Sequence, residues 1–101
     1  MTFETGKVYT FKMNSGEEMI GKVVVAATGA SYVEIENPVS VAPGPQGMGL
    51  VPSMFTADPG ENARLNINCV AMHSLTDDNI RMKYTEATTG IKLPEKKILV
   101  G

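Results

Sequence analysis

Hydrophobic and polar residues alternate with a period of two along the first part of the chain, the pattern of a strand with one buried face. In residues 8–13 the alternate positions Tyr9, Phe11 and Met13 are aromatic or apolar. This segment is therefore predicted to be the first strand of a sheet.

The turn that follows sets the pairing with the second strand. If a three-residue loop ends at Gly16 in the left-handed conformation, Phe11 lies opposite Met19. The same register places Gly21 opposite Tyr9, where the missing side chain lets the strand bend and leaves room for the tyrosine ring. Gly21 is therefore predicted to be the corner of a barrel.

The sequence predicts three further short strands, separated by turn residues. These strands are expected at residues 32–41, 48–55 and 65–75. Asn37 and Pro38 interrupt the first of them, and a bulge or kink is expected there because proline lacks the backbone donor that a central strand uses. Pro52 indicates an edge position for the next strand. A register shift is expected near Cys69 in the last one.

One helix is expected, over about residues 77–89. Thr76 is a suitable N-cap, and two aspartates follow it in the first turn, where the helix dipole favours negative charge. Ile80, Tyr84 and Ala87 recur at helical spacing and are predicted to form the buried face.

Sharply bent short strands followed by one helix predict a mostly β fold, a small five-stranded antiparallel barrel with one C-terminal α-helix, because closure removes most exposed strand edges. The length of 101 residues fits a single domain, 1–101. The barrel is expected over about 7–75, with a C-terminal tail at 91–101.

Composition and charge exclude several classes of function. The net charge is −2 and the basic residues are scattered along the chain, so the domain as a whole does not attract polyanions. Any nucleic-acid site therefore has to be local. The longest apolar run, Val23 to Ala27, is far below the roughly 20 residues of a membrane helix. A single cysteine and the lack of a signal-type start favour a cytoplasmic protein.

Candidate catalytic and metal-binding residues are few. Cys69 and His73 share a strand face but lie roughly 13 Å apart at about 3.3 Å per residue, too far for a nucleophile and its base. The same pair is too small a set for zinc. Glu34 and Glu36 alternate with apolar residues, which is typical of side chains on the solvent-exposed face of a sheet. We therefore expect no enzyme, catalytic residue, metal, cofactor or small-molecule substrate.

The best candidates for nucleic-acid binding lie at the start of the third strand. Tyr32, beside Ser31 and Thr28, could stack a nucleobase with little sequence preference. The alternative is a tyrosine that only packs against the protein.

The spacing of Gly16, Gly21 and Val23, preceded by Tyr9 and Phe11, resembles the first motif of the Sm/LSm/Hfq family. In that family the first glycine closes the hairpin and the second permits the barrel to bend. The whole chain, including the segments "GLVPSMF" and "TTGIKLP", also looks like the small Sm-like proteins of tailed phages and marine metagenomes. If the chain is encoded by a phage, its expected location is the cytoplasm of the host cell.

The resemblance implies an Sm-like, SH3-type barrel that forms a cyclic homo-oligomer and binds single-stranded RNA. Ring formation also has a physical basis, because an apolar edge strand can pair with the next copy. The residues expected at that edge are Leu50, Val51, Met54 and Phe55. The alternative is a structural or adaptor ring that binds proteins. It rests on residues 26–32, which contain neither the aspartate nor the asparagine that the family places there.

Overall fold

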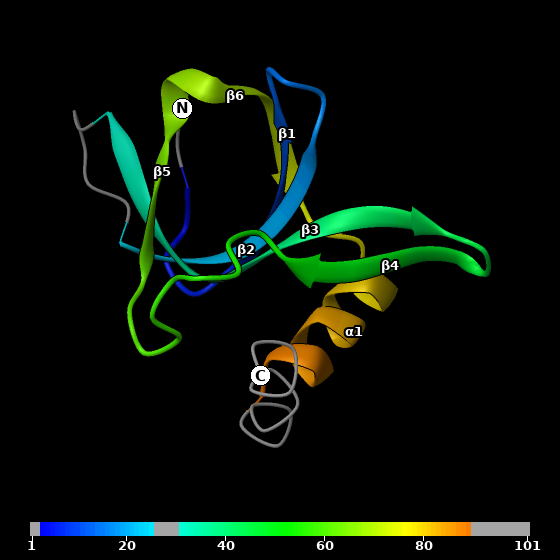
Figure 1. Ribbon diagram of the computed structural model, residues 1–101. Helices are drawn as coiled ribbons and strands as arrows, with labels where there is room; N and C mark the ends of the chain where they lie inside the picture. Colours follow the sequence, from blue (N-terminus) through cyan, green and yellow to red (C-terminus); the bar gives the residue numbers. More distant parts are fainter. Residues whose placement is uncertain (1–2, 26–30, 90–101) are drawn as a thin grey trace.

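The computed structural model of the chain describes residues 3–25 and 31–89 (Figure 1). The strands are β1 (Val8–Met13), β2 (Glu18–Val25), β3 (Tyr32–Gly44), β4 (Gly47–Pro52), β5 (Ala63–Asn66) and β6 (Val70–Leu75). A short 3-10 turn, η1, spans Ile67–Cys69, and the helix α1 spans Asp78–Thr88. The mostly β fold followed by one helix is confirmed, although the described residues form six strands where five were expected.

The strands form one antiparallel sheet in the order β4-β3-β2-β1-β6. The long strand β3 pairs with β2 along one edge, and its other edge pairs first with β5 and then with β4. Figure 1 shows a strongly curved sheet, with β5, β6, β1 and β2 arranged around the interior. Within the described residues no ladder joins β5 to β6, so the expected closure into a barrel is wrong.

The hairpin between β1 and β2 has the predicted turn and register. Gly16 has a φ of 97°, the left-handed region that glycine enters without steric cost, and its amide donates to the carbonyl of Met13 at 2.9 Å. Tyr9 pairs with Gly21 as predicted. Local turn chemistry and cross-strand side-chain pairing are therefore sufficient to set this part of the fold.

Gly21 lies at a bulge between β2 and β3. Ile20 pairs with Val39, and Lys22 pairs with Glu36. Asn37 and Pro38 of β3 therefore both face the single glycine. Asn37 has a positive φ of 51°, which asparagine tolerates better than most residues. The predicted kink in the third strand is therefore confirmed.

The space beside Gly21 is filled differently from the prediction. A Cβ atom at this position would lie 3.2 Å from Cδ1 and 3.3 Å from Cβ of Ile35, on the neighbouring strand. The Tyr9 ring instead packs edge-on against Phe3 at 5.1 Å between centroids, and its hydroxyl accepts from the amide of Glu4. Gly21 is thus required by close approach of β3 and not by the tyrosine.

The predicted fifth strand is two strands, β5 and β6, separated by η1. The Asn66 side chain accepts a hydrogen bond from the amide of Asn68 at 2.9 Å, which turns the chain out of the ladder. The amide of Val70 then donates to the carbonyl of Ile67 before β6 begins. This corner takes the chain from the edge of β3 to the edge of β1.

The predicted fourth strand ends early. β4 lies at the edge of the sheet, as expected, but it stops at Pro52. Ser53 still donates its amide to the carbonyl of Pro38, whereas Met54 and Phe55 lie beyond the strand with 51% and 67% of their surface exposed. The inclusion of these last two residues in the edge strand is therefore wrong.

Apolar side chains are buried on both faces of the curved sheet. The larger cluster fills the concave side: Phe3, Tyr9, Phe11, Met19, Val23, Val33, Ile35, Leu65 and Val70. The smaller cluster joins the sheet to α1: Val8, Ile20, Val39 and Tyr84. Neighbouring residues of β1 thus belong to different clusters, because successive strand side chains point to opposite faces.

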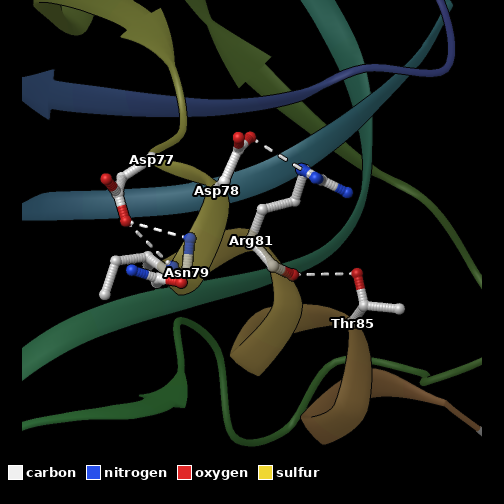
Figure 2. A network of polar contacts seen from close by, with 6 residues as sticks. Asp77, Asp78, Asn79, Arg81 and Thr85 are labelled. Carbon is white, nitrogen blue, oxygen red and sulfur yellow. Dashed lines mark hydrogen bonds and ion pairs between the residues drawn. The ribbon is translucent and has the colours of Figure 1, made fainter.

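The helix begins one residue later than predicted. Asp77 is the N-cap, and its Oδ2 accepts from the amides of Asn79 and Ile80 at 3.0 and 3.2 Å (Figure 2). Thr76, the predicted cap, is buried instead and its Oγ1 shares a hydrogen bond with Oγ1 of Thr10 at 2.9 Å. Thr76 therefore anchors the start of the helix to β1.

The buried face of α1 is the predicted one. Tyr84 is buried, and its hydroxyl donates to the carbonyl of Glu36 at 2.6 Å. Burial raises the pKa of the Tyr84 phenol, and the nearby Glu36 carboxylate adds to this effect. The tail at 91–101 lies outside the described residues.

Replacing Gly21 by valine should lower the free energy of unfolding by about 1–3 kcal/mol, because its branched side chain overpacks against Ile35. Gly49→Val is the matched control, since a Cβ there meets only the carbonyl oxygen of Ala42, at 3.9 Å. Urea unfolding of both variants measures the difference. Equal midpoints would show that close packing against β3 does not determine the choice of glycine.

Replacing Tyr84 by phenylalanine should cost about 1 kcal/mol at neutral pH, because the hydrogen bond to Glu36 is lost. The raised pKa of Tyr84 means that folding favours the protonated phenol, whose ordinary pKa is 10.0. This stabilisation is complete below the pKa of the unfolded phenol and is lost as the pH rises above it. The wild type should therefore lose more stability than Tyr84→Phe between neutral pH and about pH 11. Parallel losses in urea unfolding would contradict this assignment.

Candidate functional site

Tyr32, the first residue of β3, lies beside a cation that the sequence reasoning missed. The guanidinium carbon of Arg64, on β5, is 5.1 Å from the centroid of the Tyr32 ring, within the range of a cation–π contact. Arg64 is in register with Glu34, two residues along β3 from Tyr32. The pairing of β5 with β3 brings these side chains together. No sequence spacing indicated it, because the two strands lie far apart along the chain.

The start of β3 also contacts the η1 corner. The carbonyl of Ser31 accepts from the amide of Ile67 at 3.0 Å, and Ser31 is exposed. Nearby, Nδ2 of Asn14 donates to the carbonyl of Asn68 at 3.1 Å. Thr28, the third predicted residue of this group, lies outside the described residues.

This arrangement is chemically suited to a single-stranded nucleic acid. An aromatic ring stacks a base, and a guanidinium next to it pairs with a phosphate or stacks in turn. The local charge is small, because Arg64 is opposite Glu34 and the whole chain has a net charge of −2.

Three of the described strands are paired along one edge only. They are β4 and β6, at the two ends of the sheet path, and β5, which pairs with β3 beside that path. On β4, Met48 is 72% exposed and Val51 is partly exposed, while Leu50 turns inward against the smaller core cluster. On β6, Met72 is 66% exposed. Both ends of the sheet therefore combine an open edge with exposed apolar side chains.

Cys69 and His73 have different environments. Cys69 is exposed in η1, whereas His73 on β6 is in register with Phe11 and stacks on Phe3 at 4.5 Å between ring centroids. The Nδ1 atom of His73 is buried and has no hydrogen-bond partner among the described residues. His73 is thus part of the aromatic packing on the concave face.

Neither a metal-ligand cluster nor a membrane-spanning helix is found in residues 3–25 and 31–89. No group of three or more histidine, cysteine, aspartate or glutamate side chains lies close enough there to hold a metal ion. In the same residues, the helix is too short and too polar to cross a membrane.

Comparison of the chain with protein-family models and with curated proteins found no match.

Proposed function

We propose that this chain is an Sm-like protein that assembles into a cyclic homo-oligomer and binds single-stranded RNA on one face of the ring. The observation on which the proposal depends most is the pair of open strand edges, β4 and β6, at opposite ends of one curved sheet. The RNA-binding part of the proposal rests on the contact between Tyr32 and Arg64.

The topology supports an Sm-like fold in a partly open form. The hairpin closes at Gly16, and β3 bulges opposite Gly21, the two positions on which the family resemblance rests. The chain then passes from β5, on the edge of β3, through a 3-10 turn to β6, on the edge of β1. An SH3-type barrel needs this same sequence of strands around its core.

The two edges are suited to head-to-tail assembly. Each presents backbone donors and acceptors that a second strand could pair with, and a contact between different edges of neighbouring copies generates a ring when the rotation closes. Exposed Met48 and Val51 on β4 would then pack near Met72 and Leu75 on β6 of the next copy. Pairing would bury apolar surface that a lone copy exposes to water.

A charged residue on either edge should dissociate the assembly. Val51→Lys and Met72→Lys each place a lysine on an open edge, where it opposes pairing. Met82→Lys is the control, because Met82 is an exposed methionine, at 58% against 66% for Met72, and lies on α1 and not on an edge strand. Light scattering coupled to size exclusion should give a multiple of the chain mass for the wild type and the control, and one chain mass for the two edge variants. A monomeric wild type would remove the basis for a ring.

Binding of RNA should depend on the aromatic and cationic side chains together. Fluorescence anisotropy with labelled U-rich and A-rich oligonucleotides at low salt should show saturable binding by the wild type. Tyr32→Ala should weaken it by about 5- to 100-fold, the range for loss of one stacked base. Arg64→Gln should also weaken it, whereas Lys83→Gln, with the same change of charge on the exposed face of α1, should not. Failure of the wild type to bind at low salt would refute the RNA-binding function.

A second candidate function is an adaptor ring that binds protein partners. It is favoured by Met54 and Phe55, which follow β4 as exposed apolar side chains outside the sheet, and by the acidic balance of the chain. A ring that forms and does not bind RNA in the two experiments above would favour this adaptor.

A further inference from the structure

A cleft of about 590 Å³ lies between α1 and the sheet, and Leu75, the last residue of β6, is among the residues that line it. One wall is formed by the start of β1, by β2 and by the bulge of β3, and the other by α1. Its volume is within the range of small-molecule sites, about 300–1,000 Å³. Most of the residues that line it have polar or charged side chains, which could contact a polar occupant.

Three cationic side chains line this cleft, from three different elements. Lys7 precedes β1, Lys22 is on β2 and Arg81 is on α1. Two carboxylates, those of Glu36 and Asp78, also line it, so its lining has one net positive charge in a chain whose net charge is −2. This local reversal of sign favours an anion.

The carboxylates leave most of the cationic donors unused. Asp78 is paired with Arg81 through a single contact of 3.4 Å, at the end of its guanidinium group (Figure 2). A guanidinium has five N–H donors, so four remain for another partner. Glu36 is in register with Lys22 across the strands. The Lys7 ammonium is a further donor in the lining of the cleft.

The helix wall contributes acceptors. Oγ1 of Thr85 donates to the carbonyl of Arg81 at 2.9 Å, and Oγ1 of Thr88 donates to that of Tyr84 at 2.8 Å. Because each hydroxyl hydrogen is used within the helix, each oxygen has lone pairs but no hydrogen for an occupant of the cleft. These threonines are therefore suited to accept hydrogen bonds from hydroxyl or amino groups.

We propose that the cleft binds a small phosphate monoester that also bears hydroxyl groups, such as a sugar phosphate or a nucleoside monophosphate. The phosphate, with a charge of about −1.5 to −2 at neutral pH, lies among Lys7, Lys22 and Arg81. The hydroxyl groups donate to Thr85 and Thr88, which follow Arg81 along α1. This site is independent of the proposed RNA-binding function, because neither Tyr32 nor Arg64 lines it.

Thermal unfolding in the presence of titrated ligands tests the proposal, since a ligand that binds only the folded state raises the melting temperature. The probes are inorganic phosphate, glucose 6-phosphate and adenosine monophosphate, with sodium chloride at matched ionic strength as the screening control. Both esters should raise the melting temperature at lower concentrations than inorganic phosphate does, and chloride should have the smallest effect. The two esters distinguish a sugar phosphate from a nucleotide as the preferred class.

Variants of the cleft make the test specific. Lys22→Gln and Arg81→Gln should each weaken binding of the better ester by about tenfold, which corresponds to ~1.4 kcal/mol. Thr88→Val should weaken the ester and leave inorganic phosphate unchanged, because phosphate held by Lys7, Lys22 and Arg81 makes no contact with the Thr88 hydroxyl. Lys83→Gln is the matched control, since Lys83 is exposed on the same helix and does not line the cleft.

The outcomes separate clearly. Ester binding that is lost in the two cleft variants and kept in Lys83→Gln establishes the site. No shift beyond that of chloride, or equal shifts in all variants, overturns it. If a variant unfolds at a much lower temperature without ligand, amide chemical shifts of Gly6 and Thr89, at the two ends of the cleft, report binding in the wild type instead, and unchanged shifts reject the site.

Discussion

The close contact between Gly21 and Ile35 is the constraint on which the rest of the molecule depends. With no side chain at this point, β3 approaches β2 closely, and two residues of β3 face one of β2. A bulge of this kind increases local bend and twist. The resulting curvature encloses the aromatic cluster on one side of the sheet and lets β5 and β6 lie around the same interior (Figure 1). A flat sheet of these strands would leave Phe11 without most of its neighbours.

The convex side of the sheet would remain partly apolar without α1. Val8, Ile20 and Val39 lie there, and Tyr84 covers them from the helix. The polar atoms at this junction are also satisfied, because the Tyr84 hydroxyl donates to the carbonyl of Glu36. The helix is short and has one buried side chain, so packing on the sheet, and not intrinsic propensity, accounts for its stability. Its polar flank then forms one wall of the cleft.

Sequence patterns were sufficient where the determinants are local. The β1–β2 register, the positive φ at Gly16, the kink at Asn37 and Pro38 and the buried face of α1 all follow from residues close together in the chain. An irregularity near Cys69 was expected, but the full break at η1 was not, because one asparagine side chain decides it, against a run of apolar residues that predicts a continuous strand. Arg64 and the cleft were missed for a different reason. Both depend on which strands become neighbours, and the spacing of residues does not contain that information.

The phenol under α1 has a practical consequence. The chain contains three tyrosines and no tryptophan, so its near-ultraviolet spectrum comes mainly from phenol rings. Tyr84 is the ring that joins helix and sheet, and its ionisation is suppressed only while the two remain in contact. Phenolate absorbance that the wild type gains in alkali and Tyr84→Phe does not would therefore record separation of the helix from the sheet, without any added label.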